Sequence, residues 1–361
     1  MKTPLEFYKN KRVFITGHTG FKGSWLCAWL QELGAEVMGY ALLPHTTPNH
    51  FDLLDLQTHS IFGNIKNFSK LQKSLKDFQP EIIFHLAAQP LVRKSYTDPI
   101  DTYKTNVLGT LNLLQASRKI SSIRSIINIT TDKVYENKEW VWGYRENDPL
   151  GGYDPYSSSK ACSEILSASF RSSFFNINDF NKTHQTLIAT ARAGNVIGGG
   201  DWSADRLIPD IIRGMQKKSK IIIRNPQATR PWQHVLEPLY GYLLLGIKLY
   251  EGKTQFAQSF NFGPNAKNNL SVAAMLEIIK KNWNISYQIT PNPHFSHEAN
   301  LLMLDSSKAH SFLHWQGILD AQKSIQMTLQ WYEKNLSHSY LMTWEQIKSY
   351  SDILKTTKGK I

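Results

Sequence analysis

The sequence predicts an α/β fold, a Rossmann-type doubly wound parallel sheet with a smaller C-terminal α/β lobe. Three observations indicate this fold. Short apolar runs alternate with helix-like stretches, the runs are rich in β-branched residues, and a glycine-rich turn follows the first of them. Strands that are almost wholly apolar are typical of parallel sheets, because helices cover both faces. Strict alternation of strand and helix favours the same arrangement.

The predicted elements follow one another along the first half of the chain. We expect strands at 12–16, 36–42, 81–87 and 125–130 and within 186–198, and helices at 23–33, 69–78, 100–119 and 156–174. From about 200 to 310 the chain is less regular and richer in Pro, Trp and Asn. We therefore expect three parts: a cofactor-binding domain over 1–196 with later returning segments, a second lobe mainly over 197–335, and an extension over 336–361.

Charge and cysteine content narrow the class of protein. The 361 residues include 41 Lys and Arg against 29 Asp and Glu, a formal net charge of +12. Because the basic residues are scattered singly, apart from short clusters such as 216–220, the pattern favours a phosphate-bearing small ligand over nucleic acid. The two cysteines, Cys27 and Cys162, show neither a disulfide framework nor metal-type spacing. We expect a reducing compartment and no metal.

The chain also shows no signal for membrane insertion or export. The first residues, "MKTPLEFYKNKRV", have no apolar core of the kind found in signal peptides, and no apolar run approaches about 18 residues. We therefore expect a soluble cytoplasmic protein without a membrane partner.

The glycine turn is "GHTGFKGSWL", with Gly17, Gly20 and Gly23 directly after the first strand. Glycines here can simply permit a tight turn, or they can let the backbone approach a pyrophosphate at a helix N-terminus. The position after the first strand favours a dinucleotide. No carboxylate follows the second strand in "GYALLPHTTP", where one would hold the adenosine ribose. The choice between NAD and NADP therefore stays open.

Tyr156 and Lys160, in "YSSSK", lie four residues apart and thus on one face of the last predicted helix. A lysine ammonium beside a tyrosine lowers the pKa of the phenol, so that the tyrosine can act as a base. Such a pair is common by chance. It becomes specific because it follows both the glycine turn and a strand that ends in "NITTDKVYEN".

Several longer motifs resemble the extended short-chain dehydrogenases/reductases and, within them, the nucleotide-sugar 4,6-dehydratases. They include "TGHTGFKGSWL", "HLAAQPLVRKSY", "TYKTNVLGTLNLL", "TTDKVYEN", "YSSSK" and "RAGNVIGGGDW". Two more, "ATRPWQHVLEPLYGYL" and "HEANLLMLDSSKA", resemble the branch that acts on CDP-glucose. The resemblance covers residues from about 8 to 335.

The resemblance implies a tightly bound NAD, a nucleotide-sugar substrate such as CDP-glucose, and a role in deoxysugar biosynthesis of the lipopolysaccharide O-antigen type. It also implies a homodimer formed by the helices at 100–119 and 156–174. The implied cofactor-binding residues are Gly17, Thr19, Gly20, Phe21, Lys22, Gly23, Asn64, Ile65, Leu86, Ala87, Ala88, Gln89, Asn106, Tyr156 and Lys160. The implied substrate-binding residues are Arg93, Asn195, Arg230 and His297, although surface or core roles for Arg230 and His297 are equally compatible with the sequence. Trp232 fits packing better than recognition.

The implied catalytic residues are Thr131, Asp132, Lys133, Tyr156 and Lys160. Tyr156 takes the 4-hydroxyl proton, Thr131 hydrogen-bonds that oxygen, and an acid and a base remove water across C5 and C6. Many relatives have Asp-Glu where this chain has Asp132-Lys133. Asp132 needs a raised pKa to be the acid and Lys133 a depressed one to be the base. A dry pocket favours both shifts, whereas their mutual attraction opposes them, so the division of roles stays a hypothesis.

Proteins with other functions share some of these sequence features. A 4-epimerase needs the Tyr and Lys but no elimination pair, and a dehydratase for another nucleotide sugar would differ only in the shape of its pocket. A cofactor-binding protein without activity would be expected to lose Tyr156 or Lys160, and both are present. A nucleic-acid binder has only the net charge in its favour.

Overall fold

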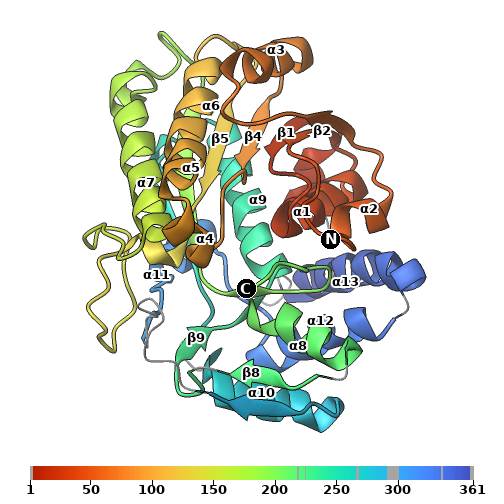
Figure 1. Cartoon of the computed structure of the whole chain (residues 1–361). Coiled ribbons are helices and arrows are strands. Elements are labelled where there is room, and N and C mark those ends of the chain that lie inside the picture. Colours follow the sequence, from red (N-terminus) through yellow and green to blue (C-terminus); the bar gives the residue numbers. More distant parts are fainter. Residues whose placement is uncertain are drawn as a thin grey trace.

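The computed structural model describes residues 3–217, 219–223, 225–265, 268–290, 301–334 and 336–357. Its centre is a seven-stranded sheet in the order β11-β6-β5-β4-β1-β2-β3, and every neighbouring pair is parallel (Figure 1). The strand order reverses between β1 and β4, which in doubly wound sheets marks the ligand-binding crevice at the carboxyl ends of the strands. The strands are β1 (Arg12–Thr16), β2 (Glu36–Ala41), β3 (His59–Phe62), β4 (Ile82–His85), β5 (Ser125–Ile129), β6 (Leu187–Ala193) and β11 (Ser259–Phe262).

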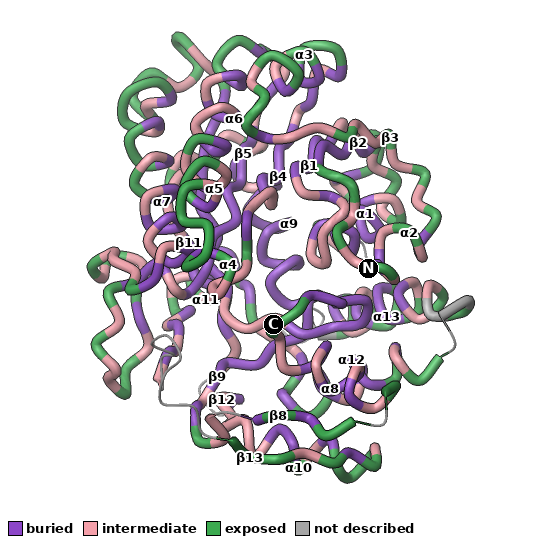
Figure 2. Tube along the Cα trace, viewed as in Figure 1, coloured by how far each residue is buried: buried purple, intermediate pink, exposed green. Residues whose placement is uncertain are grey.

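Side chains on both faces of the sheet are buried, which explains why its strands are apolar throughout. On β1, Val13 and Ile15 join one core cluster, while Phe14 between them joins the other. Ile126 and Ile127 on β5 divide in the same way. Figure 2 shows the inner strands and α9 (Leu236–Tyr250) as the most continuously buried parts of the chain. At about 25 cal/mol per Å² of apolar surface, these two clusters are the main stabilising term of the fold.

Helices cover the two faces as the alternation predicts. One face is covered by α3 (Phe68–Phe78), α6 (Gly109–Ser117) and α7 (Pro155–Ser173), and the other by α1 (Phe21–Glu32) and α9. The predicted fold class is confirmed. The elements that were not predicted include α2 (His50–Leu54) and β3, whose few residues are mostly polar, half-buried or exposed.

The helix expected at 100–119 is irregular. It consists of α5 (Pro99–Tyr103), a π-helical turn η2 (Lys104–Leu108) and α6. Within the wide turn, Asn106 points inward: its Oδ1 accepts from the backbone N–H of Gln89 at 2.8 Å, and its Nδ2 donates to Ser159 Oγ at 2.9 Å. Single π-helical turns often occur at functional sites.

The later part of the chain forms a second region below the sheet in Figure 1 and also returns to it. The returning elements are α9, which packs on β5 and β6, and β11, which pairs with β6. The last helix, α13 (Leu336–Thr357), packs against α1, α2 and α12 (Ala321–Glu333). The division of the chain at residue 196 stays a prediction. None of the described helices is both long enough and apolar enough to cross a bilayer.

Candidate active site

The turn between β1 and α1 requires glycine at two positions. Gly17 has φ +75°, and a Cβ there would lie 2.7 Å from the backbone N of Ala87 after β4. A Cβ on Gly23 would lie 2.2 Å from the carbonyl oxygen of Gly17. Gly20 instead has an extended backbone and forms the N-cap of α1, with no side-chain cap. The first N–H groups of α1 are thus available for an anion, as in dinucleotide sites.

Thr19, Phe21 and Lys22 lie on the same turn. The hydroxyl of Thr19 donates to the carbonyl of Leu42 at 2.9 Å, so this side chain ties the turn to the end of β2. Lys22 is held in a dry environment that lowers the pKa of its amine to about 7, with the charges of Arg206 and Lys160 adding to the effect. Its Nζ lies 5.9 Å from the centre of the Tyr242 ring.

The remaining predicted cofactor residues follow β3 and β4 or lie on η2. Leu86, Ala87 and Ala88 are half-buried after β4, and Gln89 hydrogen-bonds Asn106. Asn64 is half-buried and accepts from Tyr40 through its carbonyl at 3.1 Å. The Ile65 side chain packs in the core where Gly109 has no Cβ, so only its backbone faces the strand ends. Apart from the Ile65 side chain, these residues line the carboxyl edge of the sheet.

Helix α7 positions Tyr156 and Lys160. It begins at Pro155, and the N-cap Asp154 accepts from the backbone N–H of Ser157 at 2.9 Å. Both functional side chains are buried, and Lys160 Nζ donates to the carbonyl of Ile129 at 3.0 Å. Burial raises the pKa of Tyr156 to about 12, while a hydrogen bond from Thr131 and the charge of Arg206 oppose this rise.

The segment after β5 brings Thr131, Asp132 and Lys133 to the same place. Thr131 donates to Asp132 Oδ1 at 2.9 Å, and its Oγ1 accepts from the backbone N–H of Lys133 at 3.4 Å. Asp132 is buried, and no donor among the described residues reaches its Oδ2. Burial raises the pKa of Asp132, against the charges of Lys133, Arg230 and Lys22. The raised pKa is the direction that an acid requires.

Asp132 Oδ2 lies close to Gly194 at the next strand's carboxyl end. A Cβ on Gly194 would lie 3.0 Å from this oxygen. Lys133 is half-buried on the same short helical turn as Asp132. The structure therefore brings Thr131, Asp132 and Lys133 next to α7, which carries Tyr156 and Lys160, and Asp132 Oδ2 is buried without a donor among the described residues.

The predicted substrate residues lie in three places. Arg230, on β9 (Thr229–Pro231), is buried and near enough to Asp132 for its charge to lower the pKa of that carboxyl. Asn195 follows β6, half-buried, and its carbonyl accepts from Gln233. Arg93, on α4 (Val92–Thr97), forms a 2.6 Å ion pair with Asp205. His297 lies outside the described residues.

Two further residues border the site that the sequence interpretation did not include. Arg206 pairs with Asp201 at 2.8 Å, and its charge lowers the pKa of Tyr156. Tyr242, on α9, is fully buried, and among the described residues its hydroxyl has no hydrogen-bond partner. Only the neighbouring motifs, "GGGDW" and "PWQHV", could have pointed to these positions.

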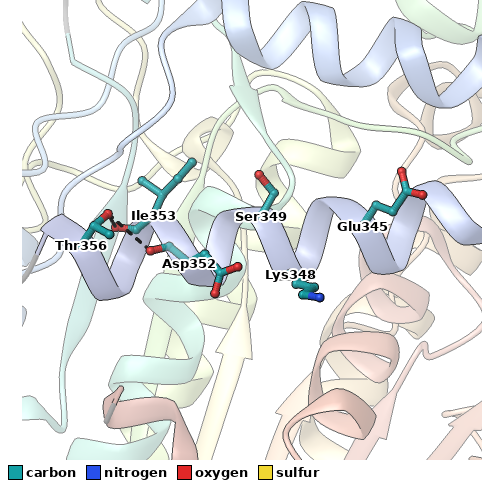
Figure 3. Close-up of a pocket in the computed structure, with 6 residues that line it drawn as sticks. All are labelled: Glu345, Lys348, Ser349, Asp352, Ile353 and Thr356. Atoms are coloured by element: carbon teal, nitrogen blue, oxygen red, sulfur yellow. Dashed lines mark hydrogen bonds between the residues drawn. The ribbon is translucent and has the colours of Figure 1, made fainter. Parts of the chain in front are cut away.

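A surface depression lies away from these residues. Figure 3 shows that it runs along one side of α13 and that all its lining residues come from that helix: Glu345, Lys348, Ser349, Asp352, Ile353 and Thr356. It contains none of the predicted site residues. Within the described ranges, no group of three or more His, Cys, Asp or Glu side chains is arranged to hold a metal ion.

A Rossmann sheet, a glycine turn and a Tyr-x-x-x-Lys helix beside a threonine at the end of β5 together define a protein of the short-chain dehydrogenase/reductase type. The family model described as GDP-mannose 4,6 dehydratase matches residues 14–328, and the chain belongs to this family. The resemblance inferred from the motifs is thereby confirmed.

Individual known proteins give a more specific comparison than the family model does. The chain is 48% identical over 331 residues to a CDP-glucose 4,6-dehydratase of Salmonella typhimurium, covering 91% of this chain and 92% of the relative. It is 24% identical to a CDP-paratose 2-epimerase of Salmonella typhi, covering 89% and 98%.

A solved dTDP-glucose 4,6-dehydratase of Bacillus anthracis, in complex with NAD, has a TM-score of 0.73 at 20% identity, covering 90% of this chain and 97% of that one. At that identity the likeness shows the shared fold.

The burial of Asp132 predicts an effect on stability. Because the folded state raises the pKa of this carboxyl above its unfolded value, the folded state holds the proton to higher pH, and folding is disfavoured as pH rises through the folded pKa. We expect Asp132→Asn to raise the Tm at pH 7.5 by a few degrees, and the gain to shrink toward pH 4. Thermal unfolding followed by circular dichroism measures both.

Asp201→Asn is the matched control, because its carboxylate accepts from Arg206 and from the backbone N–H of Ser203. Its loss should lower the Tm. An Asp132→Asn variant that is less stable than wild type at pH 7.5 would contradict the interpretation that burial of the Asp132 carboxylate lowers the stability of the fold.

Proposed function

We propose that the protein catalyses NAD-dependent 4,6-dehydration of a nucleotide hexose, converting CDP-D-glucose to CDP-4-keto-6-deoxy-D-glucose and water. The observation that carries this proposal is the buried Asp132 with one free oxygen, placed beside Lys133, Thr131 and Tyr156. An epimerase has no use for such an elimination pair. The choice of CDP-glucose rests on the 48% identity to the Salmonella typhimurium enzyme.

The glycine turn fits a dinucleotide, because Gly17 and Gly23 let the backbone of the turn pack closely and the N-terminus of α1 has no side-chain cap. We propose that the predicted cofactor residues hold NAD along the ends of β1, β3 and β4. When bound, NAD supplies the acceptor that takes hydride from C4 and returns it at C6, and a positive charge that lowers the pKa of Tyr156. A solved relative of the same fold has NAD bound.

Tyr156, Thr131 and Lys160 act in the oxidation half-reaction. Tyr156 accepts the proton of the 4-hydroxyl, and Thr131, which hydrogen-bonds the phenol, orients the same oxygen. Lys160 is fixed by the Ile129 carbonyl and lies one helical turn after Tyr156 on α7. Oxidation at C4 acidifies the hydrogen on C5, which prepares the elimination.

Asp132 and Lys133 act in the elimination. Lys133 removes the C5 proton, and Asp132, whose pKa burial raises in the direction that an acid requires, donates a proton to the leaving 6-hydroxyl. The products of this step are water and a C5–C6 enone. Arg230 and Asn195 lie beside this centre and suit the diphosphate, since a guanidinium matches phosphate oxygens. A cytoplasmic role in deoxysugar synthesis for lipopolysaccharide remains part of the proposal.

The direct test is incubation of the purified protein with NAD and CDP-glucose. A 4-keto-6-deoxy sugar should form, detected by its strong absorbance in alkali and by mass loss of one water. CDP-galactose as the product would instead identify a 4-epimerase. Parallel incubations with dTDP-, UDP- and GDP-hexoses decide whether another nucleotide sugar is preferred.

Replacing Lys133 by Met should separate the two half-reactions. The variant keeps Tyr156, Thr131 and Lys160, so it should still oxidise C4, seen as reduced-nicotinamide absorbance. It should lose exchange of the C5 hydrogen with heavy water and slow product formation by about a hundred- to ten-thousand-fold. Tyr156→Phe should instead abolish the absorbance signal.

Lys138→Met is the control, since this exposed lysine of the same loop pairs with Glu136. It should turn over normally. Full C5 exchange in Lys133→Met would place the base elsewhere.

We also propose a homodimer through α5, η2 and α7. These elements line an exposed, almost wholly apolar groove formed by Pro99, Ile100, Tyr103, Lys104, Val107, Leu108 and Cys162. Ile100 and Leu108 are 66% and 48% exposed, which is costly for a monomer in water. Two copies of such a face can bury each other about a twofold axis.

Sedimentation at micromolar concentration should therefore show a species of twice 41.3 kDa. Ile100→Glu should shift it to the monomer, because a charge would be buried in the apolar interface. Leu341→Glu, at an exposed leucine of α13, should leave the dimer intact. A wild-type protein that sediments only as a monomer would refute the proposal.

A further inference from the structure

A buried ion pair lies one helical turn beyond Lys160. Glu164 on α7 and Arg192 on β6 meet at two points, Nε to Oε1 at 3.0 Å and Nη2 to Oε2 at 3.0 Å. Their side chains are 1% and 3% exposed. Neither residue belongs to the set of side chains that faces the substrate. A two-point pair of this kind is geometrically specific, and breaking it from one side leaves a buried charge without a partner.

The ion pair is hydrogen-bonded to a residue before and a residue after the segment Thr131–Lys133. Before it, Thr130 donates to Glu164 Oε1 at 2.5 Å. After it, Arg192 Nη1 donates to the hydroxyl of Tyr135 at 2.7 Å, and the Arg192 guanidinium lies 4.9 Å from the centre of that ring. Residues 131–133 therefore lie between Thr130 and Tyr135, whose side chains are both hydrogen-bonded to this ion pair.

Lys160 is the other neighbour of this pair. It is buried, and its Nζ donates to the carbonyl of Ile129, the residue just before Thr130. Three titratable groups interact electrostatically with Lys160: Glu164 on α7, Lys22 on α1 and His85 on β4. Of these, only Glu164 is negative. Burial lowers the pKa of Lys160 to about 8, and Glu164 opposes that fall.

We propose that Glu164 is a positioning residue with two effects: it holds the Thr131–Lys133 segment against Tyr156 through Thr130 and Arg192, and its charge keeps the Lys160 ammonium protonated at neutral pH. The first effect rests on the function proposed above. The second concerns the charge of one side chain and stands without it. Arg192 on β6 and Arg171 on α7 are the cations that face Glu164 itself.

The sign of the electrostatic effect follows from the charges. Without the carboxylate, the effect of burial on Lys160 is no longer opposed by the charge of Glu164, so its ammonium loses its proton at lower pH. In Glu164→Gln the now unpaired Arg192 acts in the same direction. Removing both charges in Glu164→Gln/Arg192→Met relieves the unpaired charge but does not restore the carboxylate.

The test compares these two variants with wild type in protein labelled with ¹³C-lysine. The Lys160 ¹³Cε resonance, assigned by its absence in Lys160→Met, is followed from pH 6 to 10, and the Tm is measured in parallel. Glu237→Gln is the matched control: Glu237 is a buried carboxyl on α9 that accepts from the backbone N–H of Leu319 at 2.8 Å, away from Lys160.

We expect Glu164→Gln to lower the titration midpoint of Lys160 by about one pH unit and to lower the Tm. The double variant should regain Tm, and its midpoint should lie between that of Glu164→Gln and that of wild type. Glu237→Gln should change the Tm without moving the midpoint. A Lys160 midpoint that is unchanged in Glu164→Gln, or that returns to the wild-type value with the Tm of the double variant, would overturn the electrostatic effect.

The positioning effect is tested in active enzyme by Thr130→Val, which removes only the hydroxyl that reaches Glu164. Its kcat should fall at least about tenfold while KM changes less than twofold, because the catalytic segment and not the substrate contact is disturbed. An unchanged kcat would overturn this effect. If wild type turns over no nucleotide sugar, the proposed function fails, whereas the lysine titration still decides the electrostatic effect.

Discussion

Glu164 accepts hydrogen bonds from Arg192, Thr130, Thr190 and Ser259 at the place where α7 meets β5, β6 and β11. Taking a carboxylate and a guanidinium out of water costs several kcal/mol per ion, so the arrangement is stable only when every oxygen has its donors. This requirement couples the four elements: α7 cannot shift along the sheet without breaking a bond from β5 or β6. Because Tyr156 and Lys160 lie on α7 and Thr131 directly follows Thr130, the catalytic geometry depends on this coupling.

Several buried polar and ionisable groups of the site lower the stability of the folded protein. Asp132 is buried with one oxygen that no described donor reaches, and the buried hydroxyl of Tyr242 is likewise unpartnered within the described residues. Lys22 is held where burial lowers the pKa of its amine to about 7. Such groups cost free energy in the folded state, and the continuous apolar packing on both faces of the sheet offsets that cost. The same dry surroundings that make Asp132 unfavourable are what raise its pKa toward the range of an acid.

The sequence predicted those elements whose residue pattern lies within one short stretch of the chain. β1, β5 and α7 were predicted to within about a residue, because apolar runs and helix-like stretches are visible in the chain. It also brought Thr131 and Tyr156 together, since the carboxyl ends of parallel strands share one edge. It could not find Glu164, Arg206 or Tyr242 as neighbours of the site. Their importance comes from contacts with residues that lie far away in sequence, and no short pattern encodes such contacts.

The C-terminal helix illustrates the same limit and shows why residues 336–357 are more than an appendage. His50 accepts or donates on both sides, to Ser24 on α1 at 2.7 Å and to Thr343 on α13 at 2.9 Å. Trp331 on α12 also donates to Thr343, and it packs where Gly199 has no Cβ. Helix α1, whose first turn is the proposed anion site, is thus fixed by the sheet on its inner side and by α13 on its outer side. The cofactor turn at the start of the chain therefore takes part of its rigidity from the end of the chain.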